Sequence, residues 1–147
     1  MLNDVAIEIA DEVVNDLNAQ LFSVQFTAER QYSPKLELER GGGPLVLVAT
    51  RDVSNELIAR NRVQEQWGID VGVMAKVRDK TPESCDPWLA LVIEIRDRYS
   101  NYRTLGGRGV SFEPGAEPLY DRDWLEQKLQ FASVIQITFT IQRDIDG

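Results

Sequence analysis

The sequence has no histidine and a single cysteine, Cys85, among its 147 residues. Histidine is the most frequent general base and metal ligand in proteins, so its absence removes the commonest routes to acid–base catalysis and to a metal centre. One cysteine excludes an intrachain disulfide and fits synthesis in a reducing cytoplasm. With no histidine to activate it, the Cys85 thiol is expected to be inert. We therefore expect neither an enzyme nor a cofactor.

Long apolar runs and a basic surplus are also missing. No segment approaches the ~20 apolar residues of a membrane-spanning helix, and the acidic start MLNDVAIEIADEVV is not expected to be a signal peptide. The chain has 16 Lys and Arg against 24 Asp and Glu, a net charge of −8. This balance argues against general nucleic-acid binding, which needs basic residues to neutralise phosphates. It fits a solubilising surface, or a channel wall that lies near DNA without holding it.

The length predicts one domain spanning residues 1–147, because domains of ~100–150 residues are the most common. Two segments carry the apolar stripe of an amphipathic helix. The first runs from Leu2 to Leu17. The second is expected to start at Asp86-Pro87, with aspartate as N-cap and proline at the first helical position. Its apolar stripe consists of Trp88, Leu91, Val92, Ile95, Tyr99 and Tyr102.

Other segments have the alternation or the short apolar run that is typical of strands. These segments are Phe22–Ala28, Leu45–Ala49, Trp67–Val77 and Phe131–Ile141. Leu36 and Leu38 are expected on an exposed hairpin arm that ends at the Gly41–Pro44 turn, and residues 51–55 are expected to form another turn. Hairpin connections favour an α+β fold, with a mostly antiparallel sheet of about 4–6 strands and two helices packed on one face.

Two further patterns have both a functional and a structural interpretation. The run Gly106-Gly107-Arg108-Gly109 suggests a phosphate loop, but it lacks the Lys-Ser/Thr of such loops and no helix follows at once, so a flexible connection fits better. Paired carboxylates can hold a hard cation or do acid–base work. The pairs here do not fit the calcium-loop pattern and lie in polar segments, so they are expected to be solvated surface. They are Glu37/Glu39, Asp121/Asp123 and Asp144/Asp146.

The order of landmarks along the chain resembles that of a known family. A helix precedes FTAERQY and the apolar strand LVLVAT, and RNR leads into the strand IDVGVMAKV. A helix with WLALVIEIRDRY follows, and PLYD precedes the closing strand FASVIQITF. This succession covers nearly the whole chain. It is similar to the small head–tail joining proteins of tailed bacteriophages and prophages, in the tail-terminator or tail-completion class.

The resemblance implies a structural protein of the virion tail or neck, made in the bacterial host cytoplasm. Such proteins form a ring, usually six-fold, on the head-proximal end of the tail tube. The implied partners are further copies of the chain, the tail tube protein and the head–tail connector or stopper. DNA would pass through the lumen without specific binding, and no membrane is implied. Two alternatives stay open, namely a head-completion adaptor or stopper of the same neck, and a monomeric α+β binding module.

A cyclic ring needs head-to-tail interfaces, and exposed arms or sheet edges suit them. The candidate arms are Lys35–Pro44, Arg51–Arg62 and Arg78–Asp86. Arg60 and Arg62 are expected on one face of an extended segment, with Arg51 nearby. The expected interface residues are Arg51, Arg60, Arg62, Leu36, Leu38 and Trp124. The acids expected to face the lumen are Glu37, Glu39 and Asp52.

Overall fold

The computed structural model describes residues 5–39, 43–101, 104–112 and 117–144. Parts of the predicted helical stripes (Leu2, Tyr102), of the Gly41–Pro44 turn and of one acidic pair (Asp146) lie outside these residues. The described helices are α1 (Val5–Ala19), α2 (Pro82–Asn101) and α3 (Arg122–Lys128). The described strands are β1 (Ala28–Arg30), β2 (Leu45–Ala59), β3 (Arg62–Lys76), β4 (Thr104–Leu105), β5 (Arg108–Phe112) and β6 (Gln130–Asp144).

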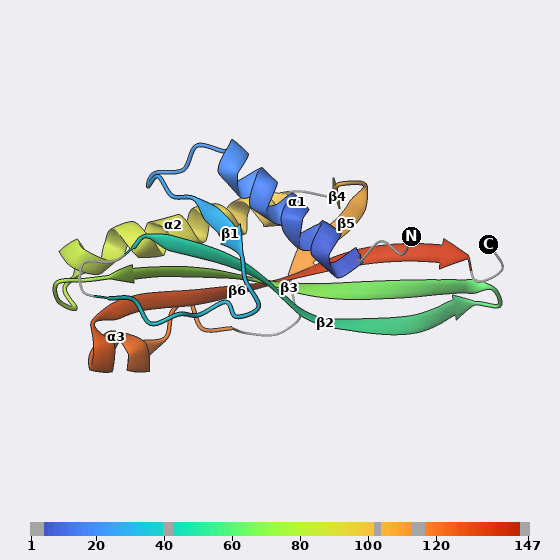
Figure 1. Cartoon of the computed structure of the whole chain (residues 1–147). Coiled ribbons are helices and arrows are strands. Elements are labelled where there is room, and N and C mark those ends of the chain that lie inside the picture. Colours follow the sequence, from blue (N-terminus) through green and yellow to red (C-terminus); the bar gives the residue numbers. More distant parts are fainter. Residues whose placement is uncertain (1–4, 40–42, 102–103, 113–116, 145–147) are drawn as a thin grey trace.

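These strands form one sheet with the order β1-β2-β3-β6-β5-β4. β1 runs parallel to β2, and the other neighbouring strands are antiparallel. The α+β class is therefore confirmed. The prediction of a mostly antiparallel sheet with two helices was wrong, because the sheet is mixed and the described residues contain three helices. The parallel pair arises because the chain does not fold back in a hairpin after β1 but crosses to the other side of the sheet before β2 (Figure 1).

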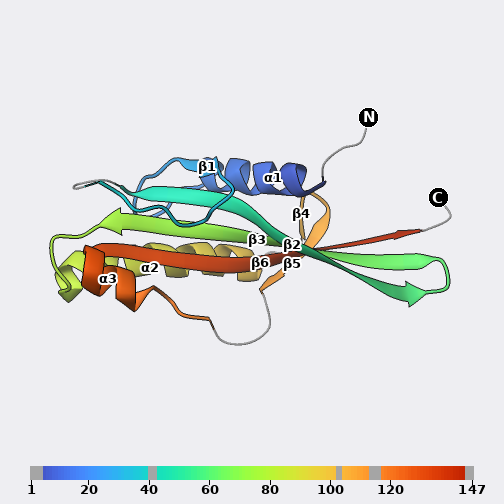
Figure 2. The ribbon, with the colours of Figure 1, turned by 60° about the horizontal axis from the view of Figure 1, so that its bottom comes forward.

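Helices α1 and α2 cover the same face of the sheet (Figure 1, Figure 2). The predicted stripes supply their buried residues, which include Ile9 and Val13 of α1 and Ile95 of α2. From the sheet, Ile69, Val71 and Val73 of β3 point into the same core, together with Phe131, Ile135, Ile137 and Phe139 of β6. The alternation predicted for Trp67–Val77 is confirmed on the helix-facing side, because Ile69, Val71 and Val73 join this core. The residues between them are buried as well, against the other face of the sheet.

The opposite face is covered by α3 and by residues 31–39, an extended segment that we call the strap (Figure 1). The strap passes over Gly72 so closely that a Cβ atom at this position would overlap the Pro34 carbonyl group. Leu38 of the strap packs with Met74 and with Trp124 of α3 in a second, smaller apolar cluster. Both faces of the body of the sheet are therefore covered, one by helices and one mainly by a single chain segment.

Three predictions about the strands were wrong. Residues 51–55 are not a turn, because β2 continues through them to Ala59 and pairs with β3 along this whole length. Leu36 and Leu38 do not lie on a hairpin arm, because the strap runs across the sheet face instead of extending a strand. Only Ala28–Arg30 of the first strand region pairs as a strand.

Helix α2 starts at Pro82, one turn before the predicted start at Asp86-Pro87. The Asp79 carboxylate organises this start by accepting hydrogen bonds from the Thr81 backbone N–H (3.1 Å), the Thr81 hydroxyl (2.5 Å) and the Ser84 hydroxyl (2.7 Å). These bonds lower the pKa of Asp79 to about 2. Pro87 therefore lies inside the helix.

Helix α3 was not predicted; it lies just before the predicted strand Phe131–Ile141. Its N-cap is Asp121, whose carboxylate accepts hydrogen bonds from the backbone N–H groups of Asp123 (3.0 Å) and Trp124 (3.1 Å). A helix of seven residues is too short to be stable alone, so its packing against the sheet must supply its stability.

The buried face of β3 gives a direct test of the core. Val73 is 0% exposed, so Val73→Ala should leave a cavity and lower the free energy of unfolding by about 1–3 kcal/mol. Leu21→Ala is the control, because it removes more atoms from a side chain that is 95% exposed and should cost less than about 0.5 kcal/mol. Urea denaturation followed by circular dichroism measures both. Similar losses for the two variants would contradict the assigned core.

Candidate assembly interface

Three strands project beyond the helices at one end of the molecule (Figure 1). We call this part the extension; it consists of residues 51–68 of β2 and β3, with their turn, and residues 138–144 of β6. β1 pairs with β2 only at residues 46–48, and β5 pairs with β6 only at residues 137–140. Within the described residues, the outer edge of β2 from residue 49 onward and that of β6 from residue 141 onward therefore face no neighbouring strand. Such open edges are ready to pair with another chain.

The two faces of the extension differ sharply in polarity. The strand registers set Val53 opposite Trp67 and Leu57 opposite Val63, and these side chains lie on the face that carries the helices elsewhere. Val53 and Leu57 remain 44% and 64% exposed. The other face carries only polar side chains in the corresponding rows. They are Ser54, Glu56, Gln64, Gln66, Thr140 and Gln142.

One carboxylate interrupts the apolar face. Glu65 is only 7% exposed, and its Oε2 atom lies 2.9 Å from Nη2 of Arg143 on the neighbouring strand. The Arg143 side chain is 67% exposed, so one partner of this ion pair is buried in the face and the other is in solvent. Asn55 pairs with Glu65 on this face, so a polar row lies between the apolar rows of Val53 and Leu57.

The base of the extension is held by a partly buried ion pair. The Arg51 guanidinium binds the Asp70 carboxylate, and its Nε atom lies 3.5 Å from Oδ1 of Asp52. Burial raises the pKa of Asp70, and the bond from Arg51 opposes this shift. Gly68 leaves the room that the Arg51 guanidinium occupies. Arg51, which was expected to contact a partner, is therefore mostly engaged within the subunit, whereas the Asp52 side chain is 66% exposed.

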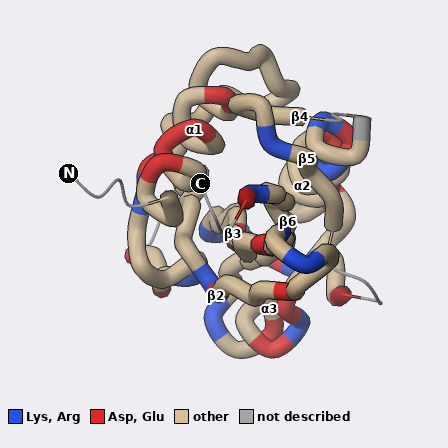
Figure 3. The backbone as a smooth tube through the Cα atoms, turned by 90° about the vertical axis from the view of Figure 1, so that its right-hand side faces the viewer, with Lys and Arg blue, Asp and Glu red and all other residues tan. Residues whose placement is uncertain are grey.

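Arg60 and Arg62 lie at the opposite end of the extension from Arg51. Arg60 is in the hairpin turn, and Arg62 is the first residue of β3 and lies 3.7 Å from the Asp144 carboxylate. Nine residues of strand separate Arg51 from Arg60, which is about 30 Å. The expected proximity of the three arginines was therefore wrong, because β2 does not turn at residues 51–55. Seen from the side of the tip, basic and acidic residues are interspersed (Figure 3).

The other predicted interface residues lie on the strap and α3, away from the tip. Gln130, which is 0% exposed, holds the strap with its side-chain amide. Its Nε2 donates to the Leu36 carbonyl (2.7 Å), and its Oε1 accepts from the Leu38 N–H (2.8 Å). A buried side chain thus makes the bonds that a neighbouring strand would otherwise make. Leu38 is partly buried by this arrangement, whereas Leu36 is 52% exposed.

Ion pairs fasten the strap to α3. Nζ of Lys35 lies 2.5 Å from the Asp121 carboxylate and lowers the pKa of that group. Nζ of Lys128 lies 3.1 Å from the Glu37 carboxylate. Both ammonium groups also sit over the Trp124 ring, at 5.4 and 5.6 Å from its centre. Trp124 therefore packs within the subunit, and Glu37 and Glu39 lie on a different part of the molecule from Asp52.

A surface cavity lies beside the strap. A cavity of about 720 Å³ is bordered by Lys35, residues 117–123 and the β6 residues Ala132, Val134 and Gln136. Glu117 on its wall is engaged by Arg96 and by the Gln136 N–H (3.4 Å).

No three His, Cys, Asp or Glu side chains of the described chain gather as a metal site requires. Over the same residues, no helix has the length and apolar character to cross a membrane.

The bonds of Gln130 give a test of the strap. Gln130→Ala would remove the partner of the Leu36 carbonyl and the Leu38 N–H, which lie in a partly buried place, and would truncate a side chain that is 0% exposed, so the free energy of unfolding should fall by about 1–3 kcal/mol. The Leu38 amide should also exchange its hydrogen faster, as seen by NMR. Gln142→Ala, on the exposed end of the same strand, should change neither quantity. A slow Leu38 amide in Gln130→Ala would contradict the clamping role.

Comparison with known proteins adds no relative. The chain matches none of the protein-family models and none of the curated proteins with which it was compared. Its function has to be argued from its residues and their geometry.

Proposed function

We propose that this protein is a tail terminator of a tailed bacteriophage. Its copies would form a ring, with six subunits, on the head-proximal end of the tail tube, where the ring ends tube growth and joins the tail to the head connector or stopper. The role is structural and not catalytic, and its place is the virion neck. The proposal rests on the resemblance of the sequence to that family and on one structural observation, which is the extension.

The extension supports an assembly role because its surface would promote unwanted association if the protein acted as a monomer. It has two open strand edges, and the apolar side chains of Val53 and Leu57 on one of its faces are 44% and 64% exposed. Monomeric proteins normally protect such edges and avoid such faces, because both promote association. A ring with cyclic symmetry needs two different patches per subunit, and an edge that adds to a neighbour's sheet supplies one of them.

The charge of the chain supports a lumen through which DNA passes without binding. The extension carries four arginines and four carboxylates, so the acid surplus that gives the net charge of −8 belongs to the rest of the chain. Carboxylates repel the DNA backbone and so prevent adhesion. The exposed acids Asp52, Glu37 and Glu39 remain the proposed lumen residues, with the Asp52 and Glu37 side chains 66% and 60% exposed.

The hairpin tip gives a test of tube binding. Reversing both tip arginines (Arg60→Glu with Arg62→Glu) should abolish capping of purified tail tubes, because it changes the sign of the exposed charge that meets the tube. The circular-dichroism spectrum and Tm should barely change, since exposed substitutions usually alter stability by less than about 0.5 kcal/mol. Cosedimentation with tubes and tube lengths in electron micrographs measure capping.

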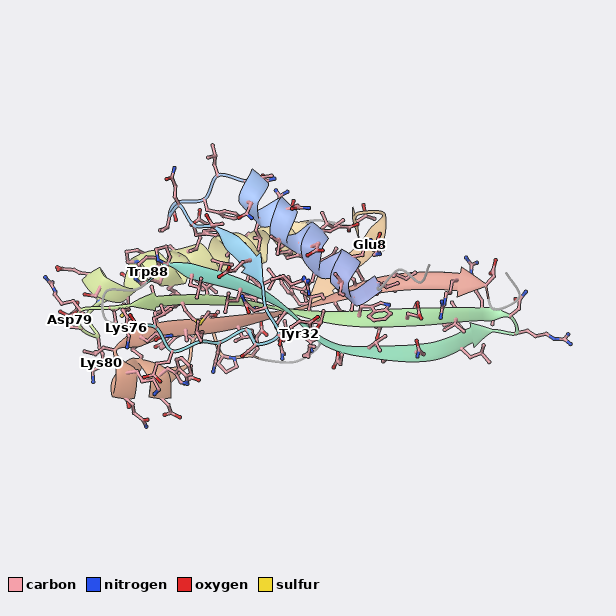
Figure 4. The ribbon with its side chains drawn as sticks, viewed as in Figure 1. Glu8, Tyr32, Lys76, Asp79, Lys80 and Trp88 are labelled. Carbon is pink, nitrogen blue, oxygen red and sulfur yellow. The ribbon has the colours of Figure 1, made fainter. Side chains whose placement is uncertain are left out.

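The control reverses two exposed basic residues at the other end of the molecule, Arg78→Glu with Lys80→Glu; Lys80 is labelled in Figure 4. The expected arm Arg78–Asp86 that contains them is not a free arm, because its residues 82–86 form the first turn of α2. This control should still cap tubes. Normal capping by the tip variant would show that the tip does not contact the tube, and loss in both variants would show a general effect of charge.

Native mass spectrometry with and without tail tubes tests the function itself. A mass near six times 16.7 kDa, alone or only on tube ends, is expected. A subunit that ignores tube ends at every concentration would remove the tail-terminator proposal. A head-side adaptor or a binding module would then be the next candidate.

A further inference from the structure

The open edge of β2 has some, but not all, of the features that keep strand edges apart. It extends from residue 49 to residue 59 and contains no proline and no lysine. Its protection consists of two irregularities in the pairing with β3, at Arg51 and Ile58, and of the charged side chains of Arg51, Asp52 and Glu56. Between them lie residues 52–57, Asp-Val-Ser-Asn-Glu-Leu, as a regular stretch of edge. Any strand that pairs with β2 must fit this stretch.

We infer that the occupant of this edge is the same edge of a second copy of the chain, running antiparallel about a two-fold axis at Asn55. This register sets Val53 opposite Leu57 of the second copy, on the apolar face. It sets Ser54 opposite Glu56 of the second copy, on the polar face. The two Asn55 side chains meet at the axis, where each amide can donate to and accept from the other. The segment V-S-N-E-L is therefore complementary to itself.

Neighbouring registers are worse for physical reasons. An axis at Ser54 sets Asp52 opposite Glu56 of the second copy, and an axis at Glu56 sets the two Glu56 carboxylates opposite each other. Like charges directly opposite destabilise a strand pair. An axis at Val53 brings Ile58 level with Val48 of the second copy, where β1 already occupies the edge. An axis at Leu57 sets the irregularity at Ile58 directly beside the axis, opposite Glu56 of the second copy, whereas an axis at Asn55 keeps both irregularities outside the pairs formed by residues 53–57.

The length of the open edge fits the same register. An axis at Asn55 brings Arg60 in the turn level with Thr50 of the second copy, just beyond the last β2 residue that pairs with β1. The regular pairs run from Val53 to Leu57, and the irregularities at Arg51 and Ile58 flank them, so β1 is not displaced. The two extensions become one six-stranded antiparallel sheet, and the apolar rows of Val53, Trp67, Leu57 and Val63 continue across the axis. Two patches, each too small for a core, become one continuous surface.

The evidence for this pairing does not depend on the proposed function. If the function is correct, the pairing affects how the ring can form. A two-fold pair occupies the edge of β2 that a ring neighbour would use, so a subunit in the pair is not free to join a ring through this edge. The dimer is then the resting form of the free protein. The tube end has to compete with it, which would delay ring formation until a tail tube is present.

Cysteine cross-linking tests the register. In a Cys85→Ser background, Asn55→Cys places two thiols opposite each other with Cα atoms about 4.5–5.5 Å apart, within disulfide range. Under mild oxidation a disulfide-linked dimer should form in most chains. Ser54→Cys is the matched control, because its thiols would be diagonal neighbours about 7–8 Å apart and should cross-link at least about fivefold more slowly. Equal rates for the two variants would overturn the axis at Asn55.

Sedimentation velocity and native mass spectrometry of the full chain test the dimer without cross-links. The wild type should show twice 16.7 kDa, with amide protection at residues 53–57 that rises with concentration. Asn55→Lys sets two ammonium groups opposite each other and should weaken the dimer about tenfold. Gln66→Lys adds the same charge to the inner strand β3 and should leave the dimer intact. A wild type that stays monomeric, or hexamers indifferent to Asn55→Lys, would overturn the inference.

One experiment distinguishes failure of the proposed dimer from failure of the proposed tail-terminator function. The reduced Asn55→Cys protein should cap tail tubes, whereas its cross-linked dimer should not. Capping by the cross-linked dimer would overturn the resting-form inference. A dimer that forms in the predicted register but never caps tubes, reduced or oxidised, would keep the pairing and remove the tail-terminator function.

Discussion

The unbroken register between β3 and β6 determines most of the molecule. The two strands pair over fifteen consecutive positions, from Arg62 opposite Asp144 to Lys76 opposite Gln130. Because a shift of one residue would turn every side chain to the other face, this ladder decides at once what each face presents. It turns Val71 and Val73 to the helices, and Gly72 and Met74 to the strap. The same alternation continues past the helices into the extension. The apolar face of the extension is therefore the core face of the sheet, left without its helices.

The parts of the fold that sequence could predict are those in which pattern and structure are local. The stripe of α2 and the alternation of Trp67–Val77 each depend on a repeat that a short window reveals, and both are found in the structure. The strap could not be predicted in this way. Leu36 and Leu38 alternate as in a strand, yet their backbone bonds go to the side chain of Gln130, more than ninety residues away in the sequence. Nothing in the local sequence distinguishes the two arrangements.

The candidate site was predicted in part, for a similar reason. Arg60 and Arg62 both lie at the exposed hairpin tip, but Arg60 is in the turn and, contrary to the prediction, the two do not share one face of an extended segment. Arg51 does not join them, because the polar stretch after it looks like a turn and becomes a strand only when β3 supplies the ladder. The polar–apolar alternation from Val53 to Leu57 was the signal that could have identified the strand. The ion-pair partner of Arg51 is Asp70, which belongs to another strand. This pair could therefore not be found from the spacing of residues in the sequence.

The outer part of the extension contributes little to the stability of the fold. Residues 54–62 lie beyond the covered core, and almost all of their side chains face solvent in the subunit. Substitutions there change the free energy of folding little, so selection for a stable fold hardly restricts them. Binding specificity can therefore drift or be replaced at the tip while the body stays the same. One scaffold could in this way serve a series of different partners, with only a short loop and the strand ends beside it rewritten each time.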